Sequence, residues 1–325
     1  MRTETQLVHR LVSIFGGVLL LCVAAAATEK GGSVWPVGAE SVAMASAVPR
    51  SGQTMVYEYT CFYVANELDD AHGKKLPLPD FKLRVFAQAV KLSHNWGTQF
   101  LGGEMVSYVA VPNVYQQLHL PNGKFTKDAL TNINLVPIEV YYHRKSAHWF
   151  YALQFETEGS GYEPGSSLNI GQHNVALTPA AGFTLTPHHG EQEISSRFDY
   201  VINNADHDTH YHSGNEFFWQ FDARQEIPHH RMTVGLVGYY YQQITDDHQN
   251  GKVFTSLNAD GTINSGNRGR QLDFGPQVTF PFGKHGGLAI KWEHDMLVQN
   301  KPRGNGFWFQ FGIPFSMLHH PNAGR

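Results

Sequence analysis

The chain has 325 residues, of which 16% are charged and 13% are aromatic, with 32 glycines and a formal net charge of −4. Soluble domains usually carry about 25% charged residues, so this composition favours many short strands joined by turns over an ordinary soluble domain. No basic run interleaves with aromatic residues, and we therefore expect no nucleic-acid partner.

The N-terminus has the pattern of an export signal. Arg2 and Arg10 precede an apolar run from Leu11 to Val23, and alanines follow it. A basic start, a short apolar core and small residues describe a secretory signal peptide, whereas a membrane anchor needs about 20 apolar residues. We expect residues 1–27 to be removed on export, which leaves Cys61 as a single cysteine and allows no internal disulfide.

Residues 28–52 are small, glycine-rich and without periodicity, and we expect them to lie outside the regular sheet. Two interpretations stay open: a flexible leader, or a plug lying in or under a pore. The residues of the possible plug are Gly31, Gly32, Trp35, Pro36 and Glu40.

From Met55 onward, apolar and polar residues alternate, and the segment 215–226 shows this most clearly. Phe217, Trp219 and Phe221 fall on one side of it, and polar residues fall on the other, with Phe218 as the one apolar exception. A strand points successive side chains to opposite faces, so this split is typical of a strand between an apolar environment and water. Two architectures produce it: a soluble sandwich or barrel with its apolar side inward, and a membrane barrel with its apolar side outward.

Similar alternation predicts about twelve strands between residues 53 and 315, and an even number is usual for single-chain bacterial barrels. We expect them near 55–63, 81–89, 104–111, 132–142, 149–156, 176–186, 193–203, 216–226, 233–243, 271–280, 288–295 and 307–315. Pro137 interrupts the fourth strand and predicts a bulge or a kink there.

The connections between these strands alternate in length, which decides between the two architectures. Short links fall at 144–147, 187–190, 227–230 and 283–287, and long ones fall at 65–79, 113–129, 158–172 and 246–269. If the first strand rises from the periplasm, every short link lies at the periplasmic rim. We therefore predict an all-β fold, a transmembrane antiparallel up-and-down β-barrel of about twelve strands formed by residues 53–315, in the bacterial outer membrane.

The barrel prediction turns the apolar face of each strand toward lipid and the polar face toward the lumen. On this rule Cys61 and the tyrosines beside it point outward. Charged side chains are expected to line the lumen and to set its selectivity. They are Arg84, Arg197, Asp199, Glu216, Asp222, Arg224, Lys291 and Glu293.

Histidines are frequent, and the loop HDTHYHS contains the residue types of a divalent-metal site in His207, Asp208, His210 and His212. Because alternation in an extended loop scatters side chains, we interpret this segment as a solvated external loop and expect no metal. Ser213 lies close to these histidines but has no nucleophile context around it, so we expect no catalytic residue, no enzyme activity and no cofactor.

Several segments resemble a known family. They are GGSVWPVGAE at 31–40, TPAAGFTLTP at 178–187, YHSGNEF at 211–217, VGLVGYYYQQITDD at 234–247 and FWFQFGIPF at 307–315. In this order they are similar to the MetA-pathway of phenol degradation family, over nearly the whole mature chain.

The resemblance implies an outer-membrane channel that is associated with the uptake of aromatic or other hydrophobic compounds. Its partners would be small-molecule solutes, outer-membrane lipids and the barrel assembly machinery. The tail at 316–325 departs from barrels that stop at a terminal aromatic residue, so the assembly signal would be internal. The alternative function is a structural or adhesive surface barrel that displays its long loops.

Overall fold

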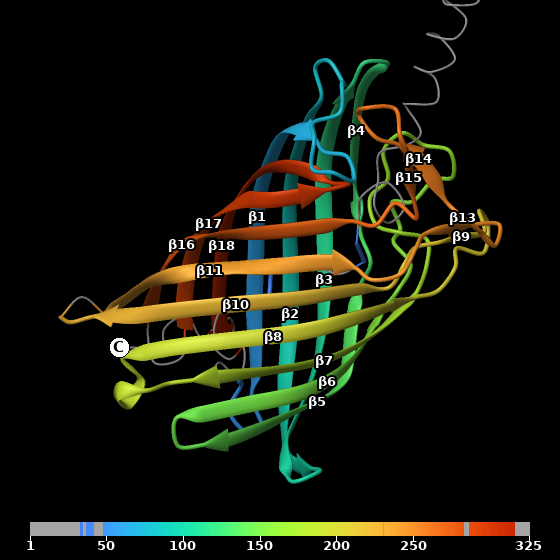
Figure 1. Ribbon diagram of the computed structural model, residues 1–325. Coiled ribbons are helices and arrows are strands. Elements are labelled where there is room, and N and C mark those ends of the chain that lie inside the picture. The colour runs from blue at the N-terminus through green and yellow to red at the C-terminus, as the bar shows by residue number, and fades with distance from the viewer. Residues whose placement is uncertain (1–32, 35–36, 42–47, 230, 283–285, 316–325) are drawn as a thin grey trace, which may run out of the picture.

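The computed structural model describes residues 33–34, 37–41, 48–229, 231–282 and 286–315, and these fold into one antiparallel β-barrel (Figure 1). The expected signal peptide (1–27) and tail (316–325) lie outside the described residues. The same holds for Gly31, Gly32, Trp35 and Pro36 of the possible plug.

Twelve strands close the barrel in the described part of the chain, as predicted. They are β1 (Thr54–Leu68), β2 (Lys82–Phe100), β3 (Gly103–Leu120), β5 (Asn134–Arg144), β6 (Ala147–Glu156), β7 (Ala176–Leu185), β8 (Gln192–Asn203), β10 (Glu216–Ile227), β11 (Met232–Gln243), β16 (Arg270–Phe282), β17 (Gly286–Gln299) and β18 (Pro302–Pro314). Each pairs with its neighbours along the chain, and β1 pairs with β18 to close the cylinder.

The remaining elements lie in the connections. They are β4 (Gly123–Leu130), β9 (Tyr211–His212), β12 (His248–Gln249), β13 (Lys252–Val253), β14 (Thr255–Leu257), β15 (Ile263–Ser265) and the 3-10 turn η1 (His188–Gly190). Among the described residues, no helix is long and apolar enough to cross a membrane.

Two connections differ from the prediction. The segment 113–129 is not an irregular loop, because β3 continues to Leu120 and turns through two residues into β4, with which it pairs. At the same long-loop end, β17 and β18 are joined by only Asn300 and Lys301, so one short link lies on the rim predicted to hold long loops. Asn300 has a φ of 52°, which is the left-handed conformation that a two-residue hairpin requires. The predicted irregularity at Pro137 is confirmed by a register shift between β5 and β6.

Most strands turn their apolar faces outward, as predicted. On β8 the apolar Phe198 is exposed on the outer face, whereas its neighbours Arg197 and Asp199 are buried inside the barrel. The same alternation places Trp219 outside and Gln220 inside on β10. An outer apolar band and a polar interior are the arrangement of a barrel in a lipid bilayer.

β1 and β2 are oriented the other way, which corrects the prediction for Cys61 and Arg84. The odd-numbered residues of β1 point inward, so Cys61 is buried in the lumen while Phe62 is exposed. On β2, Leu83 is buried inside and Arg84 is exposed on the outer face, near the long-loop end of the strand. An arginine at the rim keeps its charged group in water, whereas the tyrosines of β1 find polar partners for their hydroxyl groups inside.

Side chains fill the long-loop half of the lumen. Phe218 and Tyr241 are fully buried with ring centroids 5.0 Å apart, and Val34 packs against the same cluster from the N-terminal segment. A second cluster around Leu68 and Phe81 lies under the loop that joins β1 and β2. A twelve-stranded cylinder is narrow enough for side chains to occupy much of its interior.

We predict that Phe198→Arg lowers the free energy of unfolding by about 2–4 kcal/mol, because it places a charge at mid-strand on the lipid face. The control is Thr126→Arg on β4, which is exposed outside the closed barrel and should cost less than about 1 kcal/mol. Urea unfolding in lipid vesicles measures both changes. Equal losses at the two positions would contradict the assigned membrane band.

Candidate functional site in the barrel lumen

Residues 37–41 form a turn inside the barrel, and we call this segment the inner turn. Lys291 of β17 fixes it, because its Nζ donates hydrogen bonds to the carbonyl oxygen of Gly38 and to Ser41 Oγ, both at 2.5 Å. Gln310 of β18 donates to the carbonyl oxygen of Ala39 at 2.9 Å. Gly38 has a φ of +80°, a conformation that residues with a Cβ rarely adopt. The inner turn is therefore bound to the barrel wall through its backbone.

Glu40 at the end of the inner turn is the centre of a buried ion-pair cluster. Its Oε1 lies 2.8 Å from Lys91 Nζ of β2, and its Oε2 lies 3.6 Å from Arg197 Nη1 of β8. The hydroxyl group of Tyr59 on β1 donates to Glu40 at 3.3 Å. Lys91 Nζ also lies 3.9 Å from the centre of the Tyr108 ring, a favourable cation–π distance. Strands from opposite parts of the sequence thus converge on one carboxylate.

Arg197 extends the cluster across the lumen, and we call these contacts the Arg197 network. Its Nε donates to both oxygens of Asp199, at 3.0 and 3.1 Å, and its Nη2 donates to Gln154 Oε1 at 3.0 Å. Gln154 in turn donates to Asp199 at 3.1 Å and accepts from the Tyr108 hydroxyl at 2.6 Å. A buried guanidinium is tolerated when its donors meet acceptors in this way.

Glu40 lies in the inner turn and belongs to none of the spanning strands. Its burial and the charged groups around it shift its pKa in opposite directions. Burial raises the pKa, but the cationic Lys91 and then Arg197 lower it by more, so the net pKa lies below the usual glutamate range. Glu40 is therefore ionised at neutral pH, and its charge contributes to holding the inner turn.

The structure separates the predicted lumen residues into several places. Arg197 and Asp199 meet Glu40, whereas Lys291 and Glu293 lie beside the inner turn. The others lie toward the two ends of the barrel. At the short-turn end Arg224 lies 2.5 Å from Glu193 and 3.8 Å from Asp222, and at the long-loop end Glu216 accepts a hydrogen bond from Asn203 at 3.0 Å.

Sequence reasoning missed two buried charges, Lys91 and Glu139, that face the same space as Glu40. The predicted second strand ended at residue 89, but β2 continues to Phe100. Extending its period-2 pattern by a single step places Lys91 on the face of Leu83, which the prediction turned toward lipid. A charge on that face was the available signal that β2 is oriented the other way.

A cavity of about 510 Å³ occupies the short-turn half of the lumen. Ala39 and Glu40 of the inner turn line it together with the aromatic rings of Tyr57, Tyr59 and Tyr141. Its charged wall residues include Lys91, Glu193 and Arg224. The lumen therefore holds a space for a small solute at one end and packed side chains at the other.

The sequence profile of the family described as "Putative MetA-pathway of phenol degradation" matches residues 65–311, about three quarters of the chain. The chain belongs to this family. No curated protein matches it. The β-barrel fold described above is also found among solved structures.

Among solved structures, the fold is similar to that of the COG4313 outer membrane channel from Pseudomonas putida F1. The TM-score is 0.69 at 13% identity, and the match covers 83% of this chain and 97% of that one. The β domain of the Bordetella autotransporter BrkA gives a TM-score of 0.45 at 9% identity, covering 82% of this chain and all of that one. A mutant of the monoaromatic hydrocarbon channel TodX gives 0.41 at 8% identity, covering 91% and 98%.

We predict that Lys91→Met lowers the free energy of unfolding by about 3 kcal/mol, because Glu40 then stays buried with only its longer contact to Arg197. The double variant Lys91→Met/Glu40→Gln should lose less, since no uncompensated carboxylate remains. Urea unfolding in vesicles compares the two. Equal losses would show that Lys91 and Glu40 are not coupled.

Proposed function

We propose that this barrel is a gated channel for small solutes and that the inner turn is its gate. The observation that carries the proposal is the position of Glu40, which lines the cavity and is at the same time paired with Lys91 and Arg197 of the wall. A solute that enters from the short-turn end meets the inner turn before the packed half of the lumen. Displacement of the inner turn would join the two halves.

We further propose that the solutes are small aromatic or hydrophobic compounds linked to phenol-type degradation. The cavity volume lies within the range of small-molecule sites, about 300–1,000 Å³. Tyr57, Tyr59 and Tyr141 offer ring faces for stacking, and the charged groups beside them can bind a phenolic hydroxyl. The family description points to the same class of compound.

The test is liposome swelling with phenols, fatty acids and sugars. We expect phenols to enter faster than sugars, and we expect Glu40→Gln to raise all rates because it removes the ion pairs of the gate. A barrel that stays silent with every solute, in both forms, would favour display of the external loops over transport.

The gate should respond to pH through Glu40. A carboxylate whose pKa is lowered by folding stabilises the folded state fully above the unfolded value, about pH 4.3, and this stabilisation is lost as pH falls through the lowered value. We expect single-channel openings to be rare at pH 7 and to become more frequent as the pH falls below the ordinary glutamate range. In Glu40→Gln the openings should occur at both pH values, and an unchanged acid response in this variant would exclude Glu40.

The lumen charges are proposed to set selectivity. They are Arg197, Asp199, Glu216, Asp222, Arg224, Lys291 and Glu293. Arg224→Glu reverses a charge on the cavity wall and should shift the reversal potential in a KCl gradient toward cation preference. Arg84→Glu makes the same change on the outer face and should leave the potential unaltered. Equal shifts from the two variants would mean that the measurement reports net charge and not the lumen.

A further inference from the structure

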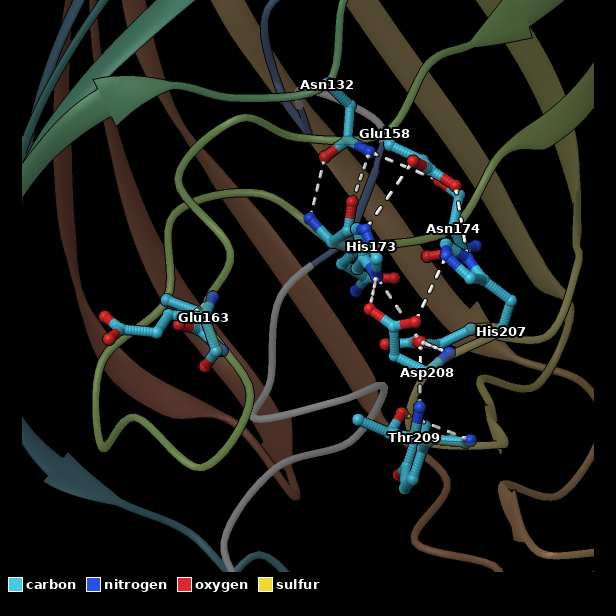
Figure 2. Close-up of polar contacts among 12 residues, drawn as sticks. Asn132, Glu158, Glu163, His173, Asn174, His207, Asp208 and Thr209 are labelled. Carbon is cyan, nitrogen blue, oxygen red and sulfur yellow. Dashed lines mark hydrogen bonds and ion pairs between the residues drawn. The ribbon is translucent and has the colours of Figure 1, made fainter.

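Two external loops bring a group of histidine and carboxylate side chains together (Figure 2). Glu158 and His173 come from the loop that joins β6 and β7. Asp206, His207 and Asp208 come from the loop that joins β8 and β10. The channel proposal uses none of these residues.

His173 is the centre of this group, because its two ring nitrogens face different carboxylates. Nδ1 lies 3.4 Å from Asp206 Oδ1 and 3.6 Å from Asp208 Oδ2, whereas Nε2 lies 3.6 Å from Glu158 Oε2. A neutral imidazole carries one proton. If Nε2 carries this proton and points it toward Glu158, the lone pair of Nδ1 faces the carboxylates of Asp206 and Asp208. A cation bound between Nδ1 and these carboxylates removes the repulsion among them.

Asp206 supplies a second, independent observation. It is 2% exposed, and its Oδ1 accepts hydrogen bonds from the backbone N–H groups of Asp208 at 2.7 Å and Thr209 at 3.0 Å. Its Oδ2 is buried, and the Tyr162 side chain stabilises the ionised carboxylate. Asp206 is therefore a buried anion with Oδ1 turned toward His173 Nδ1, and a cation between these two atoms offsets the cost of burying the charge.

The scaffold behind the group is rigid. Asn132 donates to the carbonyl oxygens of Thr157 at 2.6 Å and Gln172 at 3.1 Å, one residue before Glu158 and one before His173. The two segments of the loop that contain Gly159 and Gly171 are also in close contact. A Cβ atom added to Gly171 would lie only 2.9 Å from Gly159 Cα. The side chains of Glu158 and His173 are therefore held near each other by backbone contacts that precede any ligand.

We propose that His173 Nδ1, Asp206 and Asp208 bind one divalent metal ion of the Zn²⁺ class, and that Glu158 orients His173 through Nε2. Ligands at about 2.0–2.1 Å in tetrahedral geometry lie about 3.4 Å apart, close to the two distances from Nδ1. One imidazole and two carboxylates suit a borderline ion better than Ca²⁺ or Mg²⁺, which prefer oxygen ligands alone. Bound there, the ion connects two external loops beside the outer mouth of the barrel.

The experiment is isothermal titration calorimetry with ZnCl₂ on the full chain, purified in detergent without a histidine tag and treated with chelator. We expect one site in the wild type and at least about tenfold weaker binding in His173→Gln and in Asp206→Asn. Glu158→Gln should weaken binding about 10- to 100-fold, as loss of a metal-orienting carboxylate does. His210→Gln, a matched change in the same loop but outside the group, should bind as the wild type does.

Heat-modified gel migration confirms that each variant is folded before titration. Absence of a Zn²⁺ site in the folded wild type would overturn the proposal, and so would loss of binding in His210→Gln with retention in His173→Gln. Ca²⁺ binding as tight as Zn²⁺ binding, abolished by Asp206→Asn and untouched by His173→Gln, would also overturn it, because the ligands would then be oxygens alone.

Discussion

The pairing of Glu40 with Lys91 and Arg197 is the interaction on which the interior of this barrel depends. Lipid surrounds a narrow barrel in a membrane, so a charged side chain inside it needs an oppositely charged partner, hydrogen bonds or water. The Arg197 network meets this need by connecting β6 and β8 to the inner turn. The same contacts decide where the cavity stops, since Glu40 lies at their junction.

Lipid outside the barrel requires apolar side chains, and the interior requires polar contacts. These two constraints explain how much of the fold could be predicted. Every spanning strand was found because an apolar band on one face and polar groups on the other produce period-2 alternation. The alternation does not say which face is inward when both contain polar and apolar groups. Tyr59 reads as apolar in a sequence, yet its hydroxyl group contacts Glu40 inside the barrel. Arg84 reads as lumenal, yet it lies at the rim on the outer face.

The candidate site was predictable only where a single strand carries it. The alternation of β8 placed Arg197 and Asp199 together, and these two residues do contact each other. The partners of Glu40 come from strands far apart in the sequence, and no local pattern specifies such contacts. The same limit applies to the external loops. His207 and Asp208 were visible as possible ligands, but His173 and Glu158 come from another loop, which a scan of one segment does not bring together.

The inward position of Cys61 has a chemical consequence. It is the sole thiol among the described residues, and it lies on the interior wall of β1 where the barrel encloses it. Only 7% of the residue is exposed, and buried cysteines of this kind are inert, so a thiol reagent should leave Cys61 unmodified while the barrel is folded. Its modification would therefore report that the wall of the barrel has opened or unfolded, and not that a solute has passed through the lumen.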